Sequence, residues 1–132
     1  MTNINIDQKL LEEAKKRMEW SIYKGKEILY DDYRNLQADE FPPLVNAIYN
    51  LTLETGKKNL LIIVDVTDSY ANKEAVEAFN IAAKGSKEIA SKTAVLGITG
   101  LKKIFLNVVN KFSNIGAKPF NSIEEAKEWL IE

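Results

Sequence analysis

The chain contains no cysteine and no histidine among its 132 residues. Without cysteine it has no disulfide, no thiolate metal ligand and no thiol nucleophile. Without histidine it lacks the side chain that most often performs general acid–base catalysis and that completes the ordinary catalytic triads. These two absences exclude most familiar active sites. We therefore expect a protein that is not an enzyme, with no catalytic residues, no metal and no cofactor.

Long apolar runs and an excess of charge of one sign are missing as well. No apolar run approaches the roughly 20 residues that span a bilayer, and no early segment has the pattern of a secretory signal. The 18 basic and 19 acidic residues nearly cancel, so no overall field attracts nucleic acid. We expect a cytoplasmic protein that binds no nucleic acid, and the lack of cysteine fits a reducing compartment.

Basic residues are nevertheless concentrated in one part of the chain. Between Ser86 and Lys118 there are six lysines and a single acidic residue, Glu88. Such local imbalance predicts one basic region on an otherwise neutral molecule.

The apolar pattern predicts a helical arm followed by one domain. Apolar residues recur at helical spacing between residues 7 and 18 among many charged ones, which is typical of an amphipathic helix. We assign residues 1–18 to an N-terminal helical arm and residues 19–132 to a single domain of ordinary size. An exposed apolar face on the arm would favour a homodimer.

The domain is predicted to be α/β. Two alternating segments around Lys24-Gly25 predict a β-hairpin, and the nearly continuous apolar run at 59–65 predicts a central strand covered by helices on both faces. Helical and strand patterns then alternate to the end, which implies a mixed sheet with right-handed crossovers. The further predicted helices cover about 41–55, 73–91, 101–113 and 122–130, and the further strands cover 93–96 and 117–120, where Pro119 indicates a sheet edge.

The most informative segment is TAVLGITGLKKIFLNVVNKF, residues 93–112. It predicts a buried strand, a glycine turn and a basic helix whose N-terminal N–H groups and lysines could receive an anion. The glycines could also serve only to turn the strand into the helix. The candidate ligand-binding residues in this segment are Gly97, Thr99, Gly100, Leu101, Lys102, Lys103, Phe105, Leu106 and Val109.

The helix at 101–113 combines lysines with apolar residues. Most of the latter follow one stripe, whose ordinary role is core packing. Leu106 lies about 120° from the centre of that stripe, so we expect it to be exposed beside Lys103. An exposed apolar group next to positive charge suits an anionic lipid or an anionic membrane interface.

A second candidate region follows the central strand. Asp65, Asp68, Ser69 and Tyr70 form a polar turn that could dock a protein partner or carry a phosphorylated serine. The same oxygens could hold a hard cation, an Asp there could act as an acid or base, or the turn could need them only for capping and local hydrogen bonds.

Three segments carry a resemblance to a known family. LLIIVDVTDS, TAVLGITGLKKIFLNVVNKFS and KPFNSIEEAKEWL, in this order, resemble the SpoIIAA-like branch of the STAS family over roughly residues 19–130. The resemblance implies a four- or five-stranded mixed sheet like that of anti-sigma-factor antagonists, a fold often compared with CRAL-TRIO lipid carriers. It implies no defined enzymatic reaction. True antagonists have an Asp-Ser-Ser-Gly motif, whereas here Asp68-Ser69 is followed by Tyr70-Ala71.

Two functional hypotheses remain open. The first is a small binding protein that holds an amphipathic, lipid-like anion between the helices at 73–91 and 101–113, with peripheral membrane contact through the second helix. The alternative is a STAS protein-interaction module in a regulatory pathway, which binds its protein partner around Asp68, Ser69 and Tyr70.

Overall fold

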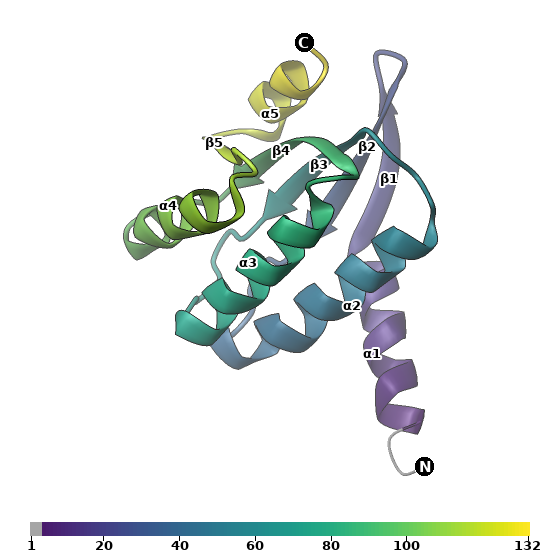
Figure 1. Cartoon of the computed structure of the whole chain (residues 1–132), viewed down its shortest axis with the longest axis vertical. Helices are drawn as coiled ribbons and strands as arrows, with labels where there is room; N and C mark the ends of the chain where they lie inside the picture. The colour runs from purple at the N-terminus through teal and green to yellow at the C-terminus, as the bar shows by residue number, and fades with distance from the viewer. Residues whose placement is uncertain (1–3) are drawn as a thin grey trace.

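The computed structural model describes residues 4–132, which form a five-stranded mixed sheet with helices on both faces (Figure 1). This confirms the predicted α/β class. The helices are α1 (Ile4–Lys16), α2 (Phe41–Glu54), α3 (Lys73–Ser86), α4 (Leu101–Ser113) and α5 (Ile123–Leu130), with a short 3₁₀ turn at Ala38–Glu40; the strands are β1 (Met18–Tyr23), β2 (Lys26–Asp32), β3 (Leu60–Asp65), β4 (Ala90–Leu96) and β5 (Lys118–Phe120).

The sheet has the strand order β1-β2-β3-β4-β5. β1 and β2 form the predicted antiparallel hairpin, whose turn residues Lys24 and Gly25 both have positive φ. The remaining pairs are parallel. The apolar β3 lies at the centre and the Pro119-containing β5 lies at one edge, as predicted.

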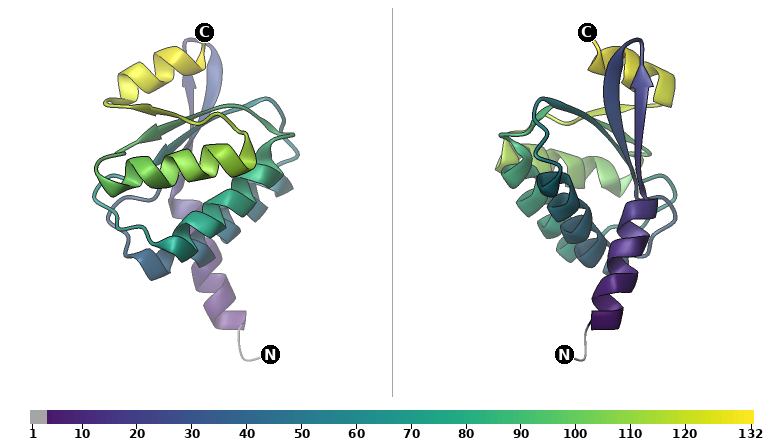
Figure 2. Two further views of the ribbon diagram at one scale, coloured as in Figure 1. Left: turned by 60° about the vertical axis from the view of Figure 1, so that its left-hand side comes forward. Right: turned by 90° about the vertical axis from the view of Figure 1, so that its right-hand side faces the viewer.

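The sequential strand order decides which face each helix covers. Right-handed crossovers that always step in one direction place their helices on the same side of the sheet. Accordingly α2, α3 and α4 lie on one face, and α5, which follows the last strand, covers part of the other (Figure 2). We call these the three-helix face and the α5 face.

Local signals explain most helix boundaries. The side chains of Asn72 and Ser122 cap α3 and α5 by accepting hydrogen bonds from Ala75 N and Glu125 N. The predicted end of α3 near residue 91 is wrong, because the helix stops at Ser86 and β4 already begins at Ala90. This earlier start lets the chain pair with the beginning of β3, where Leu60 N donates to Ile89 O at 2.8 Å.

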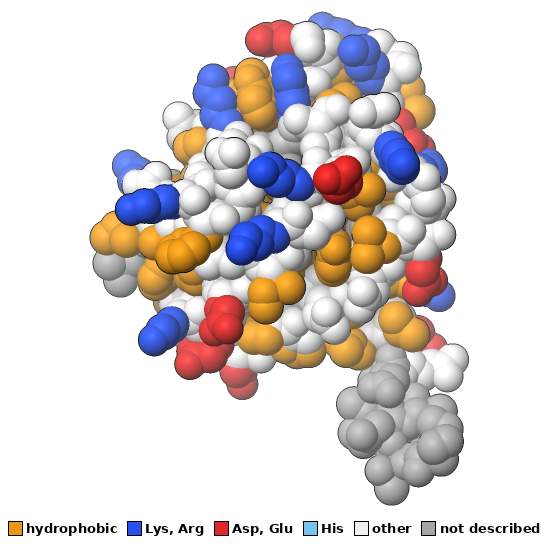
Figure 3. Space-filling model, in the orientation of Figure 1, with side chains coloured by type: hydrophobic (Ala, Val, Ile, Leu, Met, Phe, Trp, Pro, Cys, Tyr) orange, Lys and Arg blue, Asp and Glu red, His pale blue; other side chains and the backbone are white. Residues whose placement is uncertain are grey.

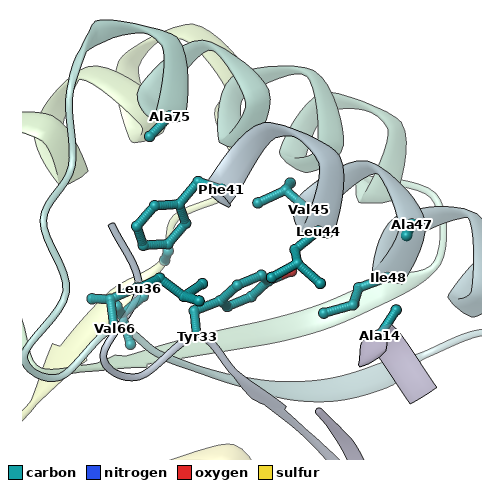
Figure 4. Packing of buried hydrophobic residues seen from close by; sticks show 12 residues of the cluster. Ala14, Tyr33, Leu36, Phe41, Leu44, Val45, Ala47, Ile48, Val66 and Ala75 are labelled. Atoms are coloured by element: carbon teal, nitrogen blue, oxygen red, sulfur yellow. The ribbon is translucent and has the colours of Figure 1, made fainter. Parts of the chain in front are cut away.

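The core of the three-helix face is built around aromatic side chains. The Tyr33 ring lies 5.9 Å from that of Phe41 and 5.2 Å from that of Phe79. Leu36, Val45 and other apolar side chains of α2 and the adjoining loop surround Tyr33 and Phe41 (Figure 4). This cluster fixes α2 over the first half of the sheet.

Helix α1 packs on the domain through only part of its length. Ala14 is fully buried in the core cluster beside α2, and Leu10 is partly buried. Leu11 is 40% exposed, and the start of the helix extends away from the domain (Figure 1). The predicted arm is therefore a helix over residues 4–16, and residues 1–3 lie outside the described part of the chain.

Candidate ligand-binding site

A cavity of about 150 Å³ lies between the three-helix face and the helices that cover it. Strand residues form its floor, and α2, α3 and α4 form its walls. Nearly all of these side chains are apolar. The main contributors are Ile62, Val64, Thr93 and Val95 from the sheet, Val45, Ile48 and Tyr49 from α2, Phe79, Ala82 and Ala83 from α3, and Phe105, Leu106 and Val109 from α4.

The composition of α3 explains why this space exists. Its cavity-facing positions include Ala82 and Ala83, whose short side chains do not reach the sheet. One turn later Gly85 meets Tyr49 of α2, and a Cβ at this position would lie 1.8 Å from Tyr49 Oη. α2 and α3 therefore contact each other closely at this end while the space beneath them stays open.

Asp31 lies on the floor of the cavity and was not among the residues predicted from the sequence. It pairs with Val64 in the sheet and is only 6% exposed. Its Oδ1 atom has no hydrogen-bond partner, and burial raises the pKa of this carboxyl to about 8. The alternation of side chains along the strand could have revealed its inward position, because Asp31 lies on the same face of the sheet as the apolar Leu29, two residues earlier.

Four of the predicted ligand-binding residues line the cavity, namely Lys102, Phe105, Leu106 and Val109. Lys102 reaches inward, and its Nζ donates to Val66 O at 3.0 Å. It thereby ties the first turn of α4 to the end of β3. Lys102 is half-buried, and it is the only lysine among the residues that line the cavity.

The glycine turn before α4 has a clear structural role. Gly97 has φ +85°, and a Cβ there would lie 2.5 Å from the Thr67 backbone. Gly100 (φ +55°) and Thr99 are exposed, and their carbonyl groups accept from the N–H groups of Lys103 and Lys102. These predicted site residues, with the exposed Lys103, lie outside the cavity, and the side chain of Leu101 lies outside the described residues.

Helix α4 is rotated relative to the prediction. Leu106, expected to be exposed, faces the cavity and packs against the core. Instead Ile104 and Phe112 are exposed, by 58% and 64%. This difference arises because apolar residues occupy more than one side of α4. Packing against α3 selects which side turns inward. Figure 3 shows hydrophobic side chains and lysines together at the edge of the molecule where α4 lies in Figure 1.

The second predicted group is brought together in one loop, but its members differ in exposure. Asp65 is buried and accepts hydrogen bonds from Thr67 N, Thr67 Oγ1 and Tyr30 Oη. Ser69 is also buried and donates to Tyr33 O. Asp68 is exposed, and Tyr70 is 67% exposed.

These positions bear on two of the predicted functions, phosphorylation of Ser69 and binding of a cation. A kinase could reach the Ser69 hydroxyl only if the loop opened, because this group holds the loop to Tyr33. The structure does not support a cation site here, since no group of three or more acidic side chains among residues 4–132 is placed to hold a metal ion.

Comparisons with known proteins identify the fold. No family model and no curated protein matches the sequence. The structure is similar to the crystal structure of an uncharacterised DUF3478-family protein with a SpoIIAA-like fold from Shewanella loihica PV-4, with a TM-score of 0.62. The match covers 86% of this chain and 91% of the other at 14% identity. The predicted SpoIIAA-like, STAS-type fold is therefore confirmed.

None of the helices in residues 4–132 combines the length and apolar character required to cross a bilayer.

Proposed function

We propose that this chain is a non-enzymatic protein that binds a small amphipathic molecule in the cavity beneath α2, α3 and α4. The observation that carries this proposal is the largely apolar cavity itself. Ligand pockets are commonly concave, apolar and supplied with a few polar groups. Here the polar groups include Asp31 on the floor and Lys102 at the α4 end.

The volume limits the ligand that fits without movement of the helices. An engineered apolar cavity of about 150 Å³ binds benzene, so the present cavity suits a ring or a short alkyl chain. A longer chain requires α4 to shift. The anionic end of the proposed ligand would lie near Lys102, whose ammonium group is already on the cavity wall.

The first experiment is native mass spectrometry of the purified protein, followed by extraction and mass analysis of anything bound. A co-purifying fatty acid or other amphiphile supports the proposal and identifies its chemistry. In parallel, octanoate is titrated into the protein and followed by amide chemical shifts in two-dimensional NMR. Shifts are expected at Val64, Val95 and Leu106, which line the cavity.

A matched pair of variants on α3 tests where the probe binds. Ala82→Leu puts a large side chain into the cavity, whereas Lys84→Leu puts the same side chain at an exposed position of the same helix. Octanoate binding is expected to weaken tenfold or more in Ala82→Leu and to stay unchanged in Lys84→Leu. Equal binding by both variants would place the probe elsewhere.

Peripheral membrane contact is a second part of the proposal, supported by the outer side of α4. Ile104 and Phe112 are exposed there, and Lys103 and Lys111 lie beside them on the same helix. Apolar side chains flanked by lysines suit an anionic bilayer surface. Flotation with phosphatidylglycerol vesicles should recover the wild type, and Lys103→Glu with Lys111→Glu should abolish recovery. Phosphatidylcholine vesicles are the control.

The alternative function is a protein-interaction module, favoured by the exposure of Tyr70 beside Asp68. Aromatic residues are common anchors of protein interfaces, and Tyr70 lies exposed in the loop at the carboxyl end of the central strand. Affinity capture with wild type and Tyr70→Ala distinguishes this case, because a partner of this loop is lost in the variant. The proposed partner class is a regulatory protein, with binding that needs no phosphate on Ser69.

A further inference from the structure

The carboxyl group of Asp31 is a polar group without a partner in an apolar cavity. The residue is 94% buried, since only 6% of it is exposed, and its Oδ1 atom accepts no hydrogen bond. Leaving a buried acceptor unpaired destabilises a protein substantially. A hydrophobic residue of similar size would avoid this at the same position.

Three other polar side chains on the cavity wall are already used within the protein. Thr52 Oγ1 donates to Ile48 O at 2.7 Å, Ser69 Oγ donates to Tyr33 O, and Lys102 Nζ donates to Val66 O. None of these three groups is directed to Asp31. Burial raises the pKa of Asp31, and no ion pair within residues 4–132 joins this carboxyl group to a basic side chain.

Resting on the proposed function, we propose that Asp31 recognises a hydroxyl group on the apolar part of the ligand. The hydroxyl would donate a hydrogen bond to Oδ1, so that the cavity prefers an alcohol or phenol over the hydrocarbon of the same shape. A site built to pair a ligand hydroxyl discriminates against the analogue without one, because the buried protein group then stays unpaired. The polar residue is thus a specificity determinant.

An uncharged hydroxyl also suits the surroundings better than a carboxylate at this point. Most residues of the cavity wall are apolar, so a ligand carboxylate beside Asp31 would be buried there without a counter-ion. Lys102 belongs to the α4 wall and is engaged with Val66 O. The two polar groups would therefore contact different ends of one ligand: Asp31 its hydroxyl group, and Lys102 its anionic end.

The test compares p-cresol with toluene, which differ by one hydroxyl group and have rings of the size that the cavity holds. Both are titrated at pH 7 into wild type, Asp31→Leu, Asp31→Asn and Asp39→Leu, with NMR shifts of cavity residues as the readout. Asp31→Leu removes the acceptor with little change in size, whereas Asp31→Asn keeps an acceptor oxygen. Asp39→Leu makes the same chemical change at an exposed site.

Wild type is expected to bind p-cresol about fivefold or more tightly than toluene, as one net hydrogen bond allows. Asp31→Leu should lose or reverse this preference, while Asp31→Asn and Asp39→Leu should retain it. Equal binding of the two probes by wild type would overturn the role of Asp31 and leave the cavity as a binding site. Binding of neither probe by wild type, together with no octanoate binding, would overturn both proposals.

Discussion

The two faces of the sheet are covered in different ways. On the α5 face, Ile28, Ile63 and Ala94 are fully buried beneath one short helix and share a cluster with its residues Ala126 and Leu130. On the three-helix face, three longer helices cover the strands and still leave a cavity of about 150 Å³. More covering structure does not produce denser packing.

The difference follows from how many contacts each helix must satisfy at once. α5 packs against the sheet without another helix beside it and can approach the strands closely. α2, α3 and α4 must fit against one another as well as the sheet, and α3 contacts both its neighbours. The close approach of Gly85 to Tyr49 satisfies the helix–helix contact, and the unfilled volume lies beneath. Such a space is available for a ligand, because the surrounding core already stabilises the fold.

Matched isoleucine truncations should separate the two faces most strongly. Ile63→Ala removes a fully buried side chain from the α5 face, and Ile48→Ala removes one that borders the cavity. Truncations of this kind cost about 2–5 kcal/mol in unfolding free energy. Ile63→Ala is expected near the top of this range and Ile48→Ala near the bottom, because a side chain beside empty space has fewer contacts to lose. Urea unfolding measures both; equal losses would contradict the comparison.

Asp31 should make the stability of the three-helix face depend on pH. The pKa of its carboxyl is raised from 3.8 to about 8 by burial, so between these values the folded state retains a proton that the unfolded chain has released. Raising the pH through this window therefore lowers the free energy of unfolding, by at most about 1.4 kcal/mol per pH unit. With no histidine or cysteine in the chain, side chains of ordinary pKa do not titrate between pH 5 and 8.

The measurement is the urea midpoint of wild type and Asp31→Asn from pH 5 to pH 8. The wild-type midpoint should fall across this range, and that of Asp31→Asn should stay nearly constant. Asp32 provides a contrast, because its neighbour Arg34 lowers the pKa of its carboxyl despite partial burial. Its stabilising contribution is present above the unfolded pKa and is lost only in more acidic solution. Parallel slopes for wild type and Asp31→Asn would contradict the prediction.

The smallest expected effect comes from adding volume instead of removing it. Ala126→Leu overfills the α5 face, where Ala126 is fully buried, and should cost about 1–3 kcal/mol. Ala82→Leu extends into the cavity and should change stability by less than about 1 kcal/mol, because the added atoms find space and apolar contacts. Thermal unfolding of the two variants compares them directly. A large loss in Ala82→Leu would show that the cavity cannot accept three additional heavy atoms.

The sequence predicted those features that depend on local patterns. The apolar run of β3, the start of α3 at Lys73 and the edge position of Pro119 all have a local physical cause, and the structure confirms each. The beginning of β4 was missed because Lys87, Glu88 and Ile89 contain no strong helix stop, and pairing with β3 decides where the strand starts.

The site was harder to predict because it depends on packing between distant segments. A cavity is volume that several helices fail to fill, so no single motif reports it. Lys102, Phe105, Leu106 and Val109 were identified from α4, but the contributions of α2 and α3 were not. Asp31 was overlooked because an acidic residue at the end of a strand usually faces water. Strands with a monotonic order also have no topological switch point, where a ligand would be sought first.

The same monotonic strand order has a consequence for the time course of folding during synthesis. Each strand from β2 onward pairs with the one made just before it, so the sheet can grow from the hairpin as the chain emerges, without waiting for distant partners. Only the α5 face is completed late, because its covering helix follows all five strands. Until then Ile28, Ile63 and Ala94 are open to solvent, and the nascent chain offers a chaperone an apolar surface that the finished protein conceals.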